Sequence, residues 1–127
     1  MDSVNFYVNA WFAQGVACDK HQKYEEAIEA YRQALRLQPE YADAWYNLGI
    51  AYGNLKKYGL ATLAYEEAVR IEPERASAWF NLGVAYYFQD KREKVREIYQ
   101  TLRKLDLAMA DEYSNAVFTE FKISPGA

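Results

Sequence analysis

Residues 45–49 read Trp-Tyr-Asn-Leu-Gly, and residues 79–83 read Trp-Phe-Asn-Leu-Gly. The two segments lie 34 positions apart. The same interval relates three sets of residues along the chain: Trp11, Trp45 and Trp79; Gly15, Gly49 and Gly83; and Tyr31, Tyr65 and Tyr99. A sequence that reuses its bulky and small residues at one fixed interval repeats one structural unit.

The middle unit predicts a pair of helices. Residues 42–55 are strong helix formers with apolar residues at i, i+3, i+4 and i+7, and residues 58–71 form a second such stretch. The second helix is expected to end before Pro73, because the residue before a proline is disfavoured in helical geometry. We expect Gly49 to face Ala61, so that the two backbones come close. One hairpin cannot bury its apolar face alone, whereas three stacked hairpins form a continuous core.

The repeated residues resemble the tetratricopeptide repeat, whose signature is Trp-x-x-Leu-Gly-x-x-Tyr, then Ala-x-x-x-Phe/Tyr, a further Ala and a Pro. The middle unit matches every position of that signature: Trp45, Leu48, Gly49, Tyr52, Ala61, Tyr65, Ala68 and Pro73. The first unit departs from it at Gln14 and Cys18, and the third at Val95, Leu102 and Leu107.

This resemblance implies an all-α fold: a right-handed superhelical stack of three antiparallel helix pairs with a terminal capping helix. It spans roughly residues 8–109 and predicts repeats at about 8–41, 42–75 and 76–109 within a single domain over residues 1–127.

The end of the chain is expected to cap the stack, because a terminal repeat has no neighbour to cover it. Residues 108–122 form one more amphipathic stretch, with Tyr113, Val117 and Phe121 on one face. Since Leu107 replaces the proline, we expect a soft bend into this helix. Residues 123–127 are predicted to be a flexible tail.

The composition argues against several classes of partner. The net charge is −3, whereas a nucleic-acid partner needs clustered Lys and Arg, so no nucleic acid is expected. No apolar run approaches the roughly 20 residues of a membrane helix, so no membrane insertion is expected. The lone Cys18 allows no internal disulfide and the N-terminus is unlike a secretory signal, which together favour a cytoplasmic protein.

No catalytic or metal site is expected either. His21 is the only histidine, and its spacing from Asp19 and Glu25 matches no metal-site pattern. Cys18 has no candidate base beside it, and a buried small hydrophobe is the usual role of such a residue. The sequence therefore predicts no enzyme activity, no cofactor and no metal.

The resemblance implies that the first helix of each unit lines a concave groove for a protein or peptide ligand. The positions that match the groove of that family in this sequence are Asn9, Phe12, Val16, Asp43, Tyr46, Asn47, Ile50, Asn54, Ser77, Phe80, Asn81, Val84, Tyr87 and Phe88, together with Ala13, Asp19 and Lys20. Positions with spacing i, i+3, i+4 and i+7 share one side of a helix.

The predicted groove is apolar, with two amides. Phe12, Tyr46 and Phe80 occupy equivalent positions, and Asn47 and Asn81 could hydrogen-bond a bound backbone. The sequence favours an adaptor, scaffold or chaperone-like module that binds an apolar or amphipathic segment. In the alternative interpretation the three aromatic residues only pack between neighbouring hairpins, as stripes at helical spacing often do.

One type of ligand is not expected. Tetratricopeptide domains that hold the acidic tails of heat-shock chaperones use a carboxylate clamp of Lys, Asn and Arg. The matching positions here are Phe12, Val16, Asn47, Ser77 and Asn81, of which only Asn47 agrees and none is a cation. A carboxylate would lose its charge-assisted hydrogen bonds in such a groove.

A second surface is predicted on the convex side. Leu60 and Leu63 occupy positions that are charged in the other two units, and they adjoin on a helix because they lie three residues apart. They form a possible contact for a homo-oligomer, so self-assembly through this patch or the repeat ends is the alternative function. Scattered exposed leucines are nevertheless normal on protein surfaces.

Overall fold

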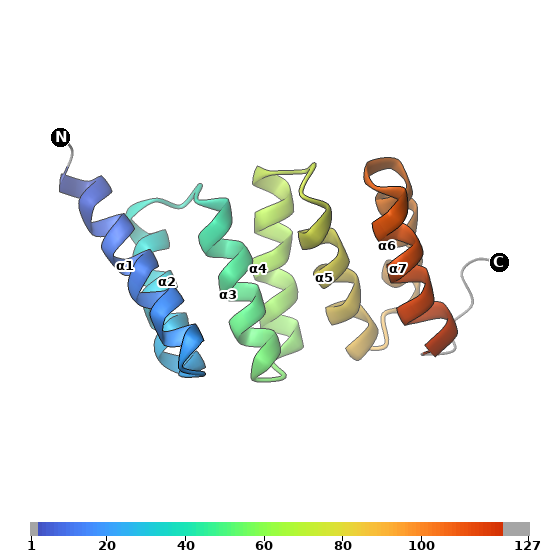
Figure 1. Ribbon diagram of the computed structural model, residues 1–127, viewed down its shortest axis with the longest axis horizontal. Coiled ribbons are helices and arrows are strands. Elements are labelled where there is room, and N and C mark those ends of the chain that lie inside the picture. The colour runs from blue at the N-terminus through green and yellow to red at the C-terminus, as the bar shows by residue number, and fades with distance from the viewer. Residues whose placement is uncertain (1–2, 121–127) are drawn as a thin grey trace.

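The computed structural model describes the backbone of residues 3–120 and the side chains of residues 3–118. Its elements are α1 (Ser3–Lys20), α2 (Tyr24–Leu37), α3 (Ala42–Asn54), α4 (Tyr58–Ile71), α5 (Ala76–Phe88), α6 (Arg92–Leu105), α7 (Leu107–Ser114) and a π-helix, η1 (Asn115–Glu120). The helices follow one another along the longest axis, with α1 and α7 at opposite ends (Figure 1). The predicted all-α stack of three helix pairs with a capping helix is confirmed.

The bounds of the middle two helices agree closely with those predicted from the sequence. The helices predicted at 42–55 and 58–71 are α3 and α4, and α4 ends at Ile71, two residues before Pro73. The predicted tail at 123–127 and the predicted cap residue Phe121 lie outside the described residues.

Each hairpin turns at a residue in the left-handed region of the backbone map. These residues are Gln22 (φ 59°), Lys56 (φ 59°) and Asp90 (φ 58°). In the middle hairpin the N–H of Lys57 donates to the carbonyl of Tyr52, and the N–H of Lys56 donates to that of Gly53, both at 2.9 Å. This pair of bonds is the Schellman motif, in which glycine is the usual left-handed residue. None of the three is glycine, so residue type gives no clear turn signal.

Each glycine of the repeat makes room for a tyrosine ring. A Cβ at Gly49 would lie 2.6 Å from Cε1 of Tyr65, and one at Gly15 would lie 2.4 Å from Cε1 of Tyr31. Such distances are well inside van der Waals contact, so any side chain here would displace the ring. The atoms nearest to a Cβ at Gly49 therefore come from Tyr65, while the predicted approach of Gly49 to Ala61 stays a prediction.

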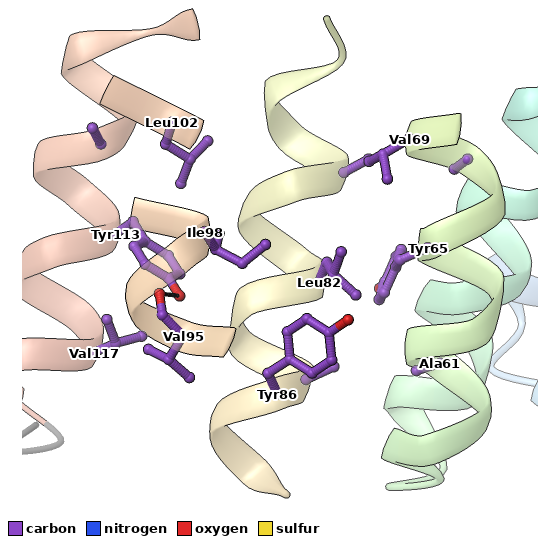
Figure 2. Packing of buried hydrophobic residues seen from close by; sticks show 14 of the residues in the cluster. Ala61, Tyr65, Val69, Leu82, Tyr86, Val95, Ile98, Leu102, Tyr113 and Val117 are labelled. Atoms are coloured by element: carbon purple, nitrogen blue, oxygen red, sulfur yellow. Dashed lines mark hydrogen bonds between the residues drawn. The ribbon is translucent and has the colours of Figure 1, made fainter. Parts of the chain in front are cut away.

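The third hairpin breaks this pattern. A Cβ at Gly83 would meet the ring of Tyr113 from α7 at 2.4 Å, while Tyr99, at the repeat position, is only half buried. The hydroxyl of Tyr113 donates to the carbonyl of Val95 at 2.7 Å (Figure 2). Val95 stands where the other units have alanine. The capping helix thus supplies the ring that closes the last hairpin, which the 34-residue interval does not predict.

The prediction of a soft bend before the capping helix is wrong. Asp106 alone separates α6 from α7, with an extended backbone (φ −159°, ψ 101°). Its side chain accepts a hydrogen bond from the N–H of Met109 at 3.0 Å. This N-cap bond satisfies one of the free donors at the start of a helix, so Asp106 ends one helix and begins the next without a proline.

Among residues 3–120, none of the helices combines the length and the apolarity that a bilayer crossing requires.

Two glycines of α3 provide a stability test of the ring contact. Gly49→Val should destabilise the protein by about 1–3 kcal/mol, because the new side chain overlaps the buried Tyr65 ring. Gly53→Ala is the matched control. A Cβ there meets nothing within 4 Å, so this change should stabilise the helix by about 0.5 kcal/mol. Urea unfolding midpoints measure both effects, and a Gly49→Val protein as stable as wild type would contradict the ring contact.

Candidate functional site

The concave side of the stack is formed by the first helices of the pairs. Helix α3 contacts α5 and α5 contacts α7, which brings these helices together along the stack. On the opposite side, clefts open between α2 and α4 and between α4 and α6. The row of α1, α3 and α5 is therefore the inner face.

The residues predicted for the groove are all at least partly open to solvent. Asn9, Asp43, Asn54 and Phe88 are exposed, and the other ten are half buried: Phe12, Val16, Tyr46, Asn47, Ile50, Ser77, Phe80, Asn81, Val84 and Tyr87. Within the described residues this face is therefore partly accessible.

The three equivalent aromatic residues each pack on at least one tyrosine, and Phe12 also stacks on Tyr41 at the start of the next hairpin, with ring centroids 4.9 Å apart. Ring centroids of Phe12 and Tyr31 lie 5.7 Å apart, those of Tyr46 and Tyr65 lie 6.1 Å apart, and Phe80 meets Tyr113 at 5.5 Å. These contacts hold the rings in place. The alternative interpretation is therefore partly right, since the rings pack within the stack, yet none of the three is sealed.

A polar cluster joins α3 to the start of α5. The guanidinium of Arg75 lies over the ring of Tyr46, 4.2 Å from its centroid, and pairs with Asp43 at 2.5 Å. The side-chain amide of Asn81 donates to the Tyr46 hydroxyl at 3.2 Å. Burial raises the pKa of the neighbouring Tyr65 phenol, which stays neutral. The sequence did not single out Arg75, because it precedes the helix and so lies outside the helical spacing.

A second polar cluster lies between α1 and α2. The hydroxyl of Tyr31 donates to one carboxylate oxygen of Asp19 at 2.5 Å. The other oxygen is buried and has no hydrogen-bond partner among the described residues. Burial raises the pKa of the Asp19 carboxyl, and the Tyr31 hydrogen bond only partly offsets this. A negative charge near the C-terminal end of α1 is also unfavourable for the helix dipole.

The residues considered for chemistry lie apart. Cys18 is buried in the first hairpin, with the side-chain nitrogen of Gln14 3.9 Å from its sulfur. His21 is exposed in the first turn. Within residues 3–118, no group of three or more His, Cys, Asp or Glu side chains is arranged to hold a metal ion.

The convex leucines line a cleft. Leu60 and Leu63 are exposed at the edge of a space of about 800 Å³ between α2 and α4. The corresponding cleft between α4 and α6 measures about 530 Å³ and has Lys94 and Glu97 in these places, 3.7 Å apart as an ion pair. The two clefts thus differ in chemistry at equivalent positions.

Comparisons with known sequences identify the repeat. A family model described as "TPR repeat" matches residues 15–56, and models described as "Tetratricopeptide repeat" match residues 42–75 and 77–106. No curated protein matches the chain in sequence.

Several solved structures share the fold. The second TPR domain of human RPAP3, in complex with the HSP70 peptide SGPTIEEVD, has a TM-score of 0.83 at 22% identity, covering 90% of this chain and 97% of that one. The first TPR of Spaghetti (RPAP3), bound to the HSP90 peptide SRMEEVD, has a TM-score of 0.81 at 22% identity and coverages of 91% and 93%. The Sgt2 TPR domain of Aspergillus fumigatus has a TM-score of 0.79 at 20% identity and coverages of 91% and 79%.

The prediction that this chain would not bind chaperone tails of the carboxylate-clamp type is wrong. Two of these similar domains were solved with peptides that end in Glu-Glu-Val-Asp. The prediction considered five helix positions and found no cation at any of them. The structure places the Arg75 guanidinium over Tyr46, where it is paired with Asp43 and Glu72, so a cation that the five positions did not include lies beside one of the predicted groove residues.

Asp19→Asn tests the buried carboxylate. The pKa of Asp19 in the folded protein is above its ordinary value of 3.8, so its contribution to stability is greatest below pH 3.8 and is lost as the pH rises through the folded pKa. Asparagine keeps an acceptor for Tyr31 without the charge. The variant should therefore exceed wild type in unfolding free energy at pH 7, by a margin that shrinks toward pH 3.8. Urea unfolding across this range measures the margin, and one that stayed constant with pH would count against the buried charge.

Proposed function

The chain belongs to the tetratricopeptide-repeat family, and we propose that it is a non-catalytic protein-interaction module whose concave groove binds an apolar or amphipathic peptide segment. In this role it acts as an adaptor, scaffold or chaperone-like protein. The similar domains solved with bound peptides support the general role of an interaction module.

The observation that carries the proposal is the row of partly open rings on the inner face. Phe12, Tyr46 and Phe80 are half buried and each packs on at least one tyrosine, so they form a rigid surface at little further cost in side-chain entropy. Tyr41 stacks on Phe12 and the Arg75 guanidinium lies over Tyr46, so the accessible part of these two rings is what remains beside those contacts. Val16, Ile50 and Val84 lie one helical turn further along and are also half buried. An apolar side chain fully buried against this row contributes about 1.5–3 kcal/mol before the costs of association.

Polar residues beside the row would orient the ligand. Asn81 donates to the Tyr46 hydroxyl and also hydrogen-bonds the Tyr65 phenol, so its amide oxygen is the group that could accept from a peptide backbone. Asn47 has the equivalent position on α3. Arg75 lies over Tyr46 at the edge of the same surface, and an acidic group on an amphipathic ligand would pair with it in competition with Asp43 and Glu72.

The alternative of self-assembly through Leu60, Leu63 or the repeat ends is less favoured. Its support is the exposure of the two leucines at the convex cleft. The peptide complexes of similar domains favour the binding role. A cytoplasmic location is part of the proposal, supported by the lone Cys18.

The groove is tested with peptides selected from a random library on the immobilised protein. We expect the selected peptides to be rich in aromatic and aliphatic residues. Ile50→Glu should weaken their binding at least tenfold, about 1.4 kcal/mol, because it places a charge in the middle of the row. Leu63→Glu on the convex side is the matched control and should bind as wild type does. Circular dichroism verifies that both variants keep their helices.

Equal binding by wild type and Ile50→Glu, or loss of binding only in Leu63→Glu, would refute the groove. A titration with SRMEEVD then separates the two ligand types. Binding by wild type that is lost in Arg75→Gln indicates an amphipathic ligand that pairs with this cation, whereas absence of binding favours a purely apolar one.

A further inference from the structure

Among residues 3–120, no helix covers α1 in the way that the preceding hairpins cover α3 and α5. Along α3 and α5 the face toward the preceding hairpin is buried and carries Ala44, Leu48 and Ala51, and Ala78, Leu82 and Ala85, respectively. The equivalent residues of α1 are Ala10, Gln14 and Ala17, and all three are exposed. Figure 1 shows α1 at one end of the stack. This stacking face is distinct from the concave groove.

Large apolar residues extend the stacking face toward the start of α1. Phe6, Tyr7 and Trp11 expose 62%, 56% and 38% of their surface, and Val4 is exposed as well. Val4, Tyr7 and Trp11 share one side of the helix because they are spaced by three and four residues. Helix α1 has 18 residues, whereas α3 and α5 have 13, and part of the additional length carries these side chains. Large apolar side chains exposed together on one side of a helix are typical of interaction sites.

The tryptophan of this face does not make the hydrogen bond to a turn carbonyl that the other two tryptophans make within the described residues. The indole N–H of Trp45 donates to the carbonyl of Pro39 at 2.7 Å, and that of Trp79 donates to the carbonyl of Pro73 at 2.8 Å. Both acceptors lie in the turn that follows the preceding hairpin. No corresponding bond joins the Trp11 indole to a carbonyl of residues 3–118. A partner that restores the pattern would therefore bring a carbonyl as well as an apolar surface.

The two covered faces show which chemistry fits. Leu35 of α2 packs in one cluster with Leu48 of α3, and Val69 of α4 packs in one cluster with Leu82 of α5. Each covering helix is followed by a turn that contains proline. Residues 3–18 contain no charged side chain, so the helix that covers α1 needs an uncharged, aliphatic face.

We propose that the outer face of α1 docks an amphipathic helix of a partner protein. This helix covers α1 as α2 covers α3, and so extends the stack by one helix. The docked helix presents aliphatic side chains to Ala10 and Ala17, and a carbonyl in its following turn accepts from the Trp11 indole. Trp11 and Tyr7 supply most of the buried apolar surface.

A second copy of the chain fits this face less well. Two α1 faces placed together would set their bulky rings opposite one another, whereas in the covered faces aliphatic side chains meet leucine and alanine. Within α1 the backbone carbonyls are used by the helix itself. The other end of the stack exposes Asp111 and Glu112 on α7, which do not suit an uncharged face.

The probe is a synthetic peptide of residues 24–41, which contains α2 and the turn with Pro39. In the folded protein this segment covers the α3 face, so in solution it stands in for the partner helix. In spectra of the ¹⁵N-labelled protein, added peptide should shift the Trp11 indole resonance and leave those of Trp45 and Trp79 unchanged. A peptide with Leu35→Asp should cause at least tenfold less shift at the same concentration.

Two alanines of α1 provide matched protein variants. Ala10→Glu places a charge on the stacking face and should weaken peptide binding at least tenfold. Ala13→Glu, also exposed on α1 but beside the concave groove, should bind the peptide as wild type does. Because neither alanine is buried, both variants should fold, and Ile50→Glu should leave this binding unchanged even if the groove proposal fails.

Three outcomes would overturn the proposal. One is a Trp11 resonance that does not move at millimolar peptide. Another is equal binding by wild type and Ala10→Glu. The third is a Trp11 resonance that moves with protein concentration alone and is accompanied by dimers in sedimentation, because a second copy would then occupy the face.

Discussion

The stack depends on one glycine in each hairpin, because the space that a side chain would occupy there is filled by a tyrosine ring. At Gly15, Gly49 and Gly83 a Cβ atom would lie within 2.6 Å of a tyrosine ring, so only glycine lets the ring close the hairpin. In the first two hairpins the ring comes from the second helix of the same pair, and in the third it comes from α7. The capping helix is therefore part of the core, and it shares one buried cluster with α5 and α6 (Figure 2).

This contact also determines what the first helices have left for a ligand. One side of each first helix carries the glycine, on which the tyrosine ring packs. In α3 and α5 a second side stacks on the preceding hairpin. Only a narrow third side remains open, and for this reason most groove residues are half buried. The aromatic residues on that side rest on the same tyrosines that close the hairpins, so the binding surface and the core share their contacts. In α1 the second side is open too, which gives this end of the molecule an additional face.

Much of this could be predicted from the sequence, because the determining residues recur. The 34-residue interval and the spacing of Trp45, Leu48 and Gly49 predicted the helix pairs and their order. The repeat boundaries and the role of each groove residue stay predictions. Features that do not recur were missed: Tyr113 takes the place of Tyr99, Asp106 makes the sharp link, and Arg75 reaches the groove from a turn. Each depends on a contact between elements that helical spacing cannot reveal.

The central claim is that the inner face receives a peptide, and intermolecular nuclear Overhauser effects between the protein and a selected peptide measure this most directly. The account predicts cross-peaks from the peptide to the rings of Phe12, Tyr46 and Phe80 and to the methyl groups of Ile50. Cross-peaks confined to Leu60 and Leu63 in the convex cleft would contradict it.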